Sequence, residues 1–223
     1  MTRDPNLKVR VKSAKGRKIS STRWLERQLN DPYVHEANRL GYRSRAAFKI
    51  QEINEKYNIF KEGQCVLDLG AAPGGWSQIA AQYVNENSQS GQVLAVDILP
   101  IDSLSGVTSL QLDIYDENII QILKDNLKKP KADLVLSDMA PSTTGHKSTD
   151  HLRIISLLEN ALDIAEEILE EGGVFVGKVF RGGTESDILN RMKKNFEKVR
   201  HVKPKSSRSN SSELYVLGLN YRK

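Results

Sequence analysis

The sequence predicts an α/β fold with a seven-stranded, mostly parallel β-sheet and helices on both of its faces. Short apolar segments alternate along the chain with longer amphipathic segments, and this alternation is typical of βα units with parallel strands. The last two apolar segments have no helical segment between them, so we expect a C-terminal hairpin that contributes one antiparallel strand. A length of 223 residues is consistent with one such domain.

Each predicted strand is a short apolar run, and most of these runs end at an acidic or turn-forming residue. The parallel strands are expected at about 65–69, 92–97, 107–112, 132–137 and 174–180. The hairpin strands are expected at about 198–203 and 213–220, on either side of a serine-rich loop. Ligands bind outside the carboxyl ends of parallel strands, so residues at those ends are the first candidates for a site.

The predicted helices are segments in which apolar residues recur with a helical period. The first runs from Ser44, which is expected to cap it, to about Tyr57. The others are expected at about 76–83, 116–127, 150–170 and 184–196. The helix at 150–170 has the clearest apolar stripe, and Gly172-Gly173 is expected to end it.

The two ends of the chain are basic and the middle is acidic. Residues 1–49 contain 13 Lys or Arg and 4 Asp or Glu, residues 50–190 contain 10 and 22, and residues 191–223 contain 10 and 2. Basic ends that meet on one face would bind phosphates, which predicts a nucleic-acid partner. The alternative is that charged ends are simply solvated. Arg43, Arg45 and Lys49 favour the first view, because they lie in a patterned helix.

The same distribution predicts how the chain is organised. Residues 1–20 are polar and basic and are expected to form a disordered tail. Residues 21–223 are expected to form a single domain, whose first part, about 21–60, is an RNA-binding helical segment. Cys65 is the only cysteine, and the four histidines show no metal-ligand spacing with it. No run of about 18 apolar residues and no apolar signal region occur, so we expect a cytoplasmic protein without metal or membrane span.

The segment from Val66 to Trp76, VLDLGAAPGGW, predicts a strand, a tight turn and a helix. Glycines at 70, 74 and 75 let the backbone approach a ligand, and the helix start offers N–H groups. Asp97 ends the next strand, where a carboxylate can accept both hydroxyls of a ribose. The segment therefore predicts a cofactor that contains a nucleoside.

The spacing narrows the choice of cofactor. The glycines do not match G-x-G-x-x-G, and no G-x-x-x-x-G-K-[ST] is present. An acid two residues before Gly70, with Asp97 ending the next strand, favours S-adenosylmethionine (SAM). Asp68 is expected near the sulfonium and amino groups of SAM, where negative charge is favourable. The alternatives are another nucleotide, or a strand–turn–helix without a ligand.

Lys178 is the most unusual charged residue, because it lies inside the apolar run Val174 to Phe180. A charge in a buried strand is costly unless it is paired or functional. Asp138 ends the neighbouring predicted strand and is the expected partner, either in a structural pair or in a catalytic one. Glu213 and Lys49 are unremarkable when each is considered alone.

In combination, these residues resemble the RrmJ/FtsJ-type ribosomal RNA 2′-O-methyltransferases from about Trp24 to the C-terminus. The resemblance rests on YRSRAAFK at 42–49, the Asp68–Trp76 loop, SDMAP at 137–141, KVF at 178–180, and SSR at 206–208 followed by ELY at 213–215. It implies a Rossmann-like, SAM-dependent methyltransferase fold. One departure is Ser142, where the best-known member of the family has Asn after the proline.

The resemblance also implies the site and the substrate. The family's Lys-Asp-Lys-Glu tetrad maps to Lys49, Asp138, Lys178 and Glu213. Its cofactor contacts map to Gly74, Trp76, Asp97, Asp113 and Asp138, to which the loop adds Asp68 and Gly70. The implied substrate is a uridine 2′-hydroxyl in the A loop of 23S ribosomal RNA within the large ribosomal subunit. The enzyme itself is expected to be a monomer. The alternatives are methylation of another RNA, such as tRNA, and a non-catalytic ribosome assembly factor.

Overall fold

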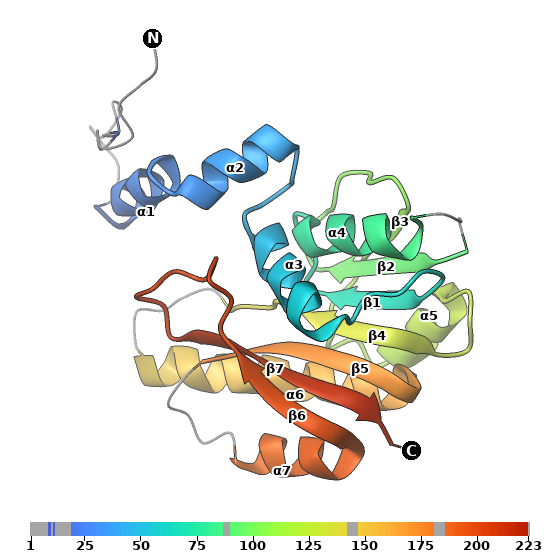
Figure 1. Cartoon of the computed structure of the whole chain (residues 1–223). Coiled ribbons are helices and arrows are strands. Elements are labelled where there is room, and N and C mark those ends of the chain that lie inside the picture. The colour runs from blue at the N-terminus through green and yellow to red at the C-terminus, as the bar shows by residue number, and fades with distance from the viewer. Residues whose placement is uncertain are drawn as a thin grey trace.

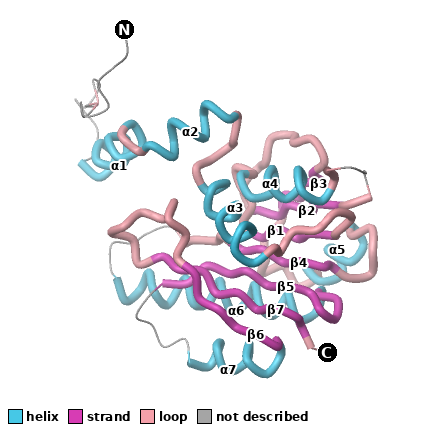
Figure 2. Tube along the Cα trace, in the orientation of Figure 1, coloured by secondary structure: helices cyan, strands magenta, loops and turns pink. Residues whose placement is uncertain are grey.

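The computed structural model describes residues 9, 11, 19–86, 90–141, 147–180 and 186–222. Most of the predicted tail at 1–20 lies outside the described residues, as does the part of the Ser142 loop at 142–146. Figures 1 and 2 show one twisted sheet with helices packed on it and two more helices, α1 and α2, beyond one end of the sheet.

The strands form one sheet in the order β3-β2-β1-β4-β5-β7-β6. They are β1 (Cys65–Leu69), β2 (Gln92–Asp97), β3 (Val107–Gln111), β4 (Ala132–Ser137), β5 (Leu169–Phe180), β6 (Phe196–Val202) and β7 (Glu213–Tyr221). Strands β1 to β5 pair in parallel, and β7 pairs antiparallel with both β5 and β6. The predicted mixed sheet, with one antiparallel strand from the C-terminal hairpin, is confirmed.

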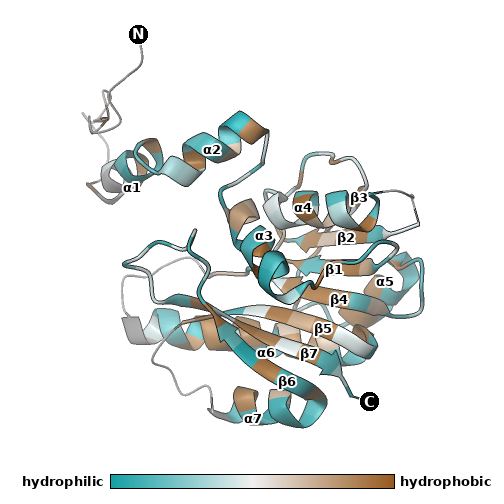
Figure 3. Ribbon diagram, in the orientation of Figure 1, coloured by the Kyte–Doolittle hydropathy of each residue, from teal (hydrophilic) through white to brown (hydrophobic). Residues whose placement is uncertain are grey.

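Helices cover both faces of the sheet. On one face α3 (Ala46–Tyr57) and α4 (Gly75–Val84) pack on side chains such as Val66 and Leu134. On the other, α5 (Ile119–Asn126), α6 (Lys147–Ile168) and α7 (Ser186–Asn195) pack on side chains such as Leu67 and Val135. Neighbouring residues of a strand point to opposite faces, so the two cores use alternate positions. Figure 3 shows the apolar residues gathered in the inner strands.

The N-terminal helices are α1 (Ile19–Leu29) and α2 (Pro32–Leu40). Helix α1 begins inside the segment that was predicted to be a tail. Asp31 caps α2 by accepting a hydrogen bond of 3.1 Å from the Tyr33 amide, and Pro32 occupies the first turn, where a missing N–H costs nothing. Gly41 ends α2 in the left-handed conformation, with φ of 72°.

The prediction that Ser44 caps α3 is wrong. The helix begins at Ala46, and none of the described side chains caps it. The Ser44 hydroxyl is buried without a hydrogen-bond partner among the residues that the structure describes, and it faces Gly75, where a Cβ atom would lie only 2.3 Å from it. Close packing between the segment before α3 and the start of α4 therefore determines the position of Ser44.

The boundary between α6 and β5 also differs from the prediction. Strand β5 starts at Leu169, directly after α6, so Gly172-Gly173 lies inside the strand instead of ending the helix. Gly172 has φ of 79°, and the pairing of β4 with β5 shifts register between Ala132 and Leu134. The backbone freedom of the glycines, which was expected to end the helix, instead accommodates an irregularity in the strand.

Candidate active site

The predicted site residues gather at the carboxyl ends of neighbouring strands. Asp97 ends β2, Asp113 follows β3, and Asp138 follows β4 directly. Lys178 lies near the end of β5 and pairs with Tyr215 of β7 in the sheet register. These positions follow from the parallel order of the strands, because parallel strands end at one edge. Helix α3 lies over this edge and brings Lys49 to it.

The four residues of the predicted tetrad come together as two linked ion pairs. Lys178 Nζ lies 2.7 Å from Asp138 Oδ1 and donates a hydrogen bond of 2.6 Å to the Asp138 backbone carbonyl. Lys49 Nζ lies 2.8 Å from Glu213 Oε1. The pairs approach each other, with 3.8 Å between Lys49 Nζ and Asp138 Oδ2. Both lysines are buried, at 7% exposure each, so solvent screens these charges little.

Tyr215 joins the two pairs, and sequence reasoning gave it no role. Its hydroxyl donates a hydrogen bond of 2.6 Å to Asp138 Oδ1 and accepts one of 3.0 Å from Lys49 Nζ. The residue is fully buried and packs against Trp76, with ring centroids 5.4 Å apart. A signal existed in the sequence: Tyr215 stands two residues after Glu213 in a predicted strand, so both side chains point to one face.

Burial and charge act in opposite directions on Asp138. Burial alone would raise the pKa of this carboxyl, but Lys178, Lys49 and the hydrogen bonds from Lys178 and Tyr215 outweigh it, so the pKa is lowered. Burial, together with Asp138 and Glu213, raises the pKa of Tyr215 well above its usual value. The carboxylate therefore stays ionised and the phenol stays neutral at ordinary pH.

The glycine loop after β1 makes a close backbone surface beside these residues. Gly70 and Gly74 have φ of 71° and 104°, and a Cβ atom would lie 2.2 Å from Met139 at the first and 2.6 Å from Leu104 at the second. The Asp97 carboxylate fixes this loop by accepting a hydrogen bond of 2.9 Å from the Ala72 amide. Its other oxygen accepts one of 2.8 Å from the Leu99 amide, in the segment after β2. Each oxygen retains a lone pair for a further donor.

Exposed apolar side chains flank the strand-end acids. Ile98 and Leu99 directly follow Asp97 and are 61% and 59% exposed, and Tyr115, just beyond Asp113, is 56% exposed. Such residues suit a flat apolar ring, and the neighbouring carboxylates suit hydroxyl groups. The glycine loop, the acids and these side chains together fit the nucleoside of SAM, and the apolar members of the set were missed by sequence reasoning.

A family model described as FtsJ-like methyltransferase matches residues 42–221. The chain belongs to the FtsJ-like methyltransferase family. The predicted resemblance is therefore confirmed, and so is the prediction of a methyltransferase. The methyl donor of the FtsJ-like methyltransferases is SAM, as the glycine loop predicted.

Individual relatives agree with this assignment. A protein of Paramagnetospirillum magneticum named ribosomal RNA large subunit methyltransferase E is 56% identical over 219 residues, which covers 97% of this chain and 89% of the relative. A protein of Rhodopseudomonas palustris with the same name is 50% identical, and the match covers 97% of this chain and 92% of that relative. A crystal structure of a Plasmodium falciparum protein, described as a ribosomal RNA methyltransferase, matches with a TM-score of 0.72 at 30% identity. The match covers 81% of this chain and 98% of the Plasmodium chain.

Two residues predicted to contact the cofactor, Trp76 and Asp68, have buried side chains in this FtsJ-like chain. The Trp76 indole is 2% exposed and donates a hydrogen bond of 2.8 Å to the Ala46 carbonyl, so this side chain ties α4 to α3 and leaves only its backbone for a ligand. Asp68 is 1% exposed, and its Oδ2 accepts a hydrogen bond of 2.6 Å from Ser77. Asp68 lies inside β1, next to Ser77 of α4, and its contact with the cofactor stays a prediction.

Asp68 is nevertheless the most perturbed acid of this region. Burial, only partly offset by the Ser77 hydrogen bond, raises the pKa of Asp68 to about 7, and the charges of Asp138 and Asp97 add to this effect. Its second oxygen, Oδ1, is buried without a hydrogen-bond partner among the described residues. The carboxyl is thus close to half protonated at neutral pH.

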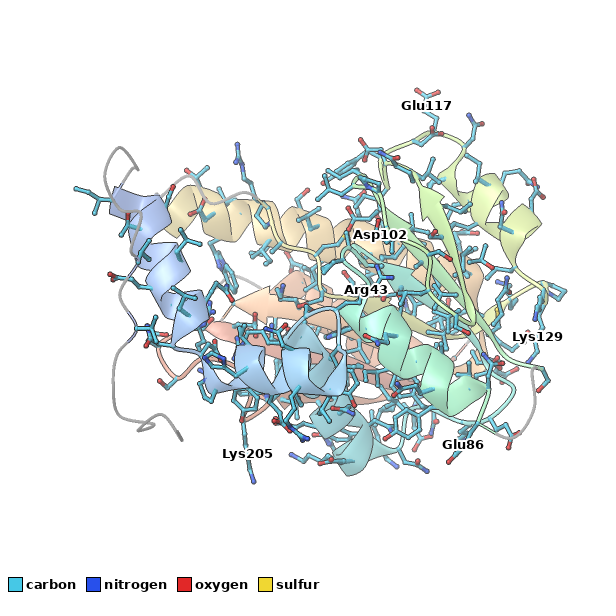
Figure 4. The ribbon with its side chains drawn as sticks, turned by 90° about the horizontal axis from the view of Figure 1, so that it is seen from above. Arg43, Glu86, Asp102, Glu117, Lys129 and Lys205 are labelled. Atoms are coloured by element: carbon cyan, nitrogen blue, oxygen red, sulfur yellow. The ribbon has the colours of Figure 1, made fainter. Side chains whose placement is uncertain are left out.

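The two arginines that led the nucleic-acid prediction bind groups of the protein itself. Arg43 donates a hydrogen bond of 2.7 Å to the Ser103 carbonyl and lies 3.8 Å from Asp102, its neighbour in Figure 4. The Arg45 side chain is 15% exposed and forms an ion pair of 3.1 Å with Asp31. Exposed basic residues such as Lys205 are therefore the better candidates for contacts with RNA phosphates.

Other features of the described residues lie apart from this edge. A cavity of about 410 Å³, lined by Gln64, Asp133 and Glu171 among others, opens at the amino end of the strands, where α/β folds do not bind ligands. Across the described ranges, no cluster of three His, Cys, Asp or Glu side chains is arranged to hold a metal ion. None of the described helices is long and apolar enough to cross a membrane.

Proposed function

We propose that this chain methylates the 2′-hydroxyl of a uridine ribose in the A loop of 23S ribosomal RNA, within the assembled large ribosomal subunit. The observation that carries the proposal is the buried Lys178–Asp138 pair, joined through Tyr215 to Lys49 and Glu213 at the strand edge that fits SAM. The names of the bacterial relatives support the ribosomal substrate.

Lys178 is the residue that acts on the ribose hydroxyl. When bound, SAM supplies an electrophilic methyl group on a positively charged sulfur. Two acceptors of Asp138 hold Lys178 Nζ, which leaves one position of the amine for the 2′-oxygen. As a base, the Lys178 amine would accept the hydroxyl proton while the methyl group passes from sulfur to the 2′-oxygen, and ionised Asp138 would stabilise the resulting ammonium. If the amine stays protonated, it orients the oxygen by donating a hydrogen bond.

Lys49 and Glu213 position the ribose beside Lys178. Lys49 is fixed by Glu213 and by the Tyr215 hydroxyl, so its amine has a defined place next to Asp138. The residues proposed to hold the cofactor are Gly70, Gly74, Trp76, Asp97, Asp113, Asp138 and Asp68, with Trp76 acting through its backbone.

The rest of the chain is proposed to bring the substrate to this edge. Residues 21–223 act as one domain and as a monomer, and the helical segment at about 21–60 contacts ribosomal RNA. The excess of basic over acidic residues at both ends of the chain supports this assignment. A substrate in the ribosome would place the protein in the cytoplasm.

The test is single-turnover methylation of large subunits that lack the modification, with labelled SAM and mapping of the methylated ribose. Lys178→Ala should lower the rate by roughly 100-fold or more, the scale for losing positioned proton transfer. Lys198→Ala, an exposed lysine of β6 paired with Glu197, is the matched control and should leave the rate unchanged. A near wild-type rate in folded Lys178→Ala would contradict the proposal.

A further inference from the structure

The Lys49–Glu213 pair joins two segments that are distant in the sequence. Lys49 lies on α3, and Glu213 starts β7 just after the loop at 203–212. Helix α3 holds this loop along one face: Arg45 donates a hydrogen bond to the Ser206 carbonyl, and Glu52 accepts one of 2.9 Å from the Ser206 amide. Residues 45, 49 and 52 recur at helical spacing, so one face of α3 contacts both the loop and the tetrad.

Asp31 closes this assembly from the far side. Its Oδ2 lies 3.1 Å from Arg45 Nε, an ion pair without hydrogen-bond geometry, and accepts a hydrogen bond of 3.1 Å from Arg208 Nη2. The Asp31 side chain is 7% exposed, so this carboxylate bridges two guanidinium groups largely out of water. Arg45 directly precedes α3, and Arg208 lies in the loop.

Each arginine is close in the sequence to a residue that belongs to the tetrad or contacts it. Arg45 is one helical turn before Lys49. Arg208 follows Ser207, whose hydroxyl donates a hydrogen bond of 2.8 Å to Glu213 Oε1. A closed path therefore runs from Asp31 through each arginine to the two members of the Lys49–Glu213 pair.

We infer that Asp31 is a positioning residue for methyl transfer, which sets the placement of Lys49 relative to Glu213 by neutralising Arg45 and Arg208 together. This inference rests on the proposed function. Without the carboxylate, two neighbouring guanidiniums repel each other and push the loop away from α3. Glu52 still holds the loop backbone, so the site shifts without coming apart.

The experiment uses Asp31→Asn in the full chain. Asparagine caps helices as well as aspartate does, so α2 keeps its start while the bridging charge is lost. The expected result is a fall in kcat of about 10-fold to 100-fold on large subunits, the scale for a small misplacement of catalytic groups. The KM for subunits and the Kd for SAM should stay at the wild-type values. Glu167→Gln, which removes an exposed acid of α6 paired with Lys124, is the matched control and should change nothing.

Arg208→Gln breaks the same bridge from the loop side and keeps the inference testable if Asp31→Asn folds poorly. Both single variants should lower kcat, and the double variant should be no worse than the more impaired single variant, because both changes break one bridge. A raised KM with unchanged kcat would mean that Asp31 only supports substrate binding, and wild-type kcat in folded Arg208→Gln would also overturn the inference. Absence of methylation by the wild-type chain would instead refute the proposed function.

Discussion

The raised pKa of Asp68 makes a quantitative prediction for stability. The pKa is 3.8 for an ordinary aspartate and about 7 in the fold. Between these values the folded protein keeps a proton that the unfolded chain has lost, so unfolding releases a proton and rising pH favours unfolding. Asp68 therefore does not change the free energy of unfolding below pH 3.8 and lowers it progressively between pH 3.8 and about pH 7. Above about pH 7 the penalty is complete and stays constant.

The magnitude follows from about 1.4 kcal/mol for each pH unit between the two pKa values. The full penalty is about 4 kcal/mol, of which about 2 kcal/mol should be lost by the wild type between pH 5.5 and pH 8.5. Asp68→Asn removes the ionisation and keeps an oxygen for the Ser77 hydroxyl. Its new amide group needs a partner, and this cost does not depend on pH, so the slope is the diagnostic quantity.

Urea unfolding of the wild type and of Asp68→Asn at pH 5.5, 7.0 and 8.5 measures this slope. The free energy of unfolding of the variant, relative to wild type, should rise by about 2 kcal/mol over that range. Asp102→Asn is the control, because the Asp102 side chain is 96% exposed. If the wild type and Asp68→Asn show parallel pH dependence, the carboxyl is ionised throughout and the argument from burial is wrong.

Three further predictions concern the site and the RNA. Tyr215→Phe removes hydrogen bonds to two charged groups, so thermal and urea unfolding should show a loss of about 1.5–3 kcal/mol, and the rate of methylation should fall with it. Asp97→Ala should weaken SAM binding by about 1.5–3 kcal/mol in calorimetry, and unchanged affinity would defeat the assignment of this carboxylate. Binding of large subunits should weaken steeply with salt, and Lys205→Glu should reduce that dependence while Lys129→Glu, on the opposite side in Figure 4, should not. A flat salt dependence would rule out phosphate contacts.

The fold could be predicted because the spacing of apolar residues along the sequence distinguishes the strands from the helices. Each parallel strand is an apolar run, and the absence of a helical pattern between the last two strands correctly placed β7 antiparallel to its neighbours. The errors occurred where tertiary packing decides. Ser44 has the chemistry of a helix cap, but α3 begins two residues later, at Ala46, and the Ser44 hydroxyl packs against Gly75 of α4.

The site was predictable only in part. Lys178 and Asp138 stood out by local pattern, because a charge in an apolar strand needs a partner. Lys49 and Glu213 have no such signal, and only the family resemblance connected residues separated by 164 positions. The distance of Asp68 from Gly70 could not show how deeply its side chain is buried, where it accepts a hydrogen bond from Ser77 of α4.

The place of β7 has a consequence for the order in which activity arises during synthesis. Of the seven strands it is the last in the sequence, yet it lies between β5 and β6. A growing chain therefore carries β5 with an open edge until β7 inserts, and such edges invite pairing with other chains. Since β7 also brings Tyr215 and Glu213, a nascent chain that has already formed its SAM-binding half would be catalytically silent until this strand enters the sheet.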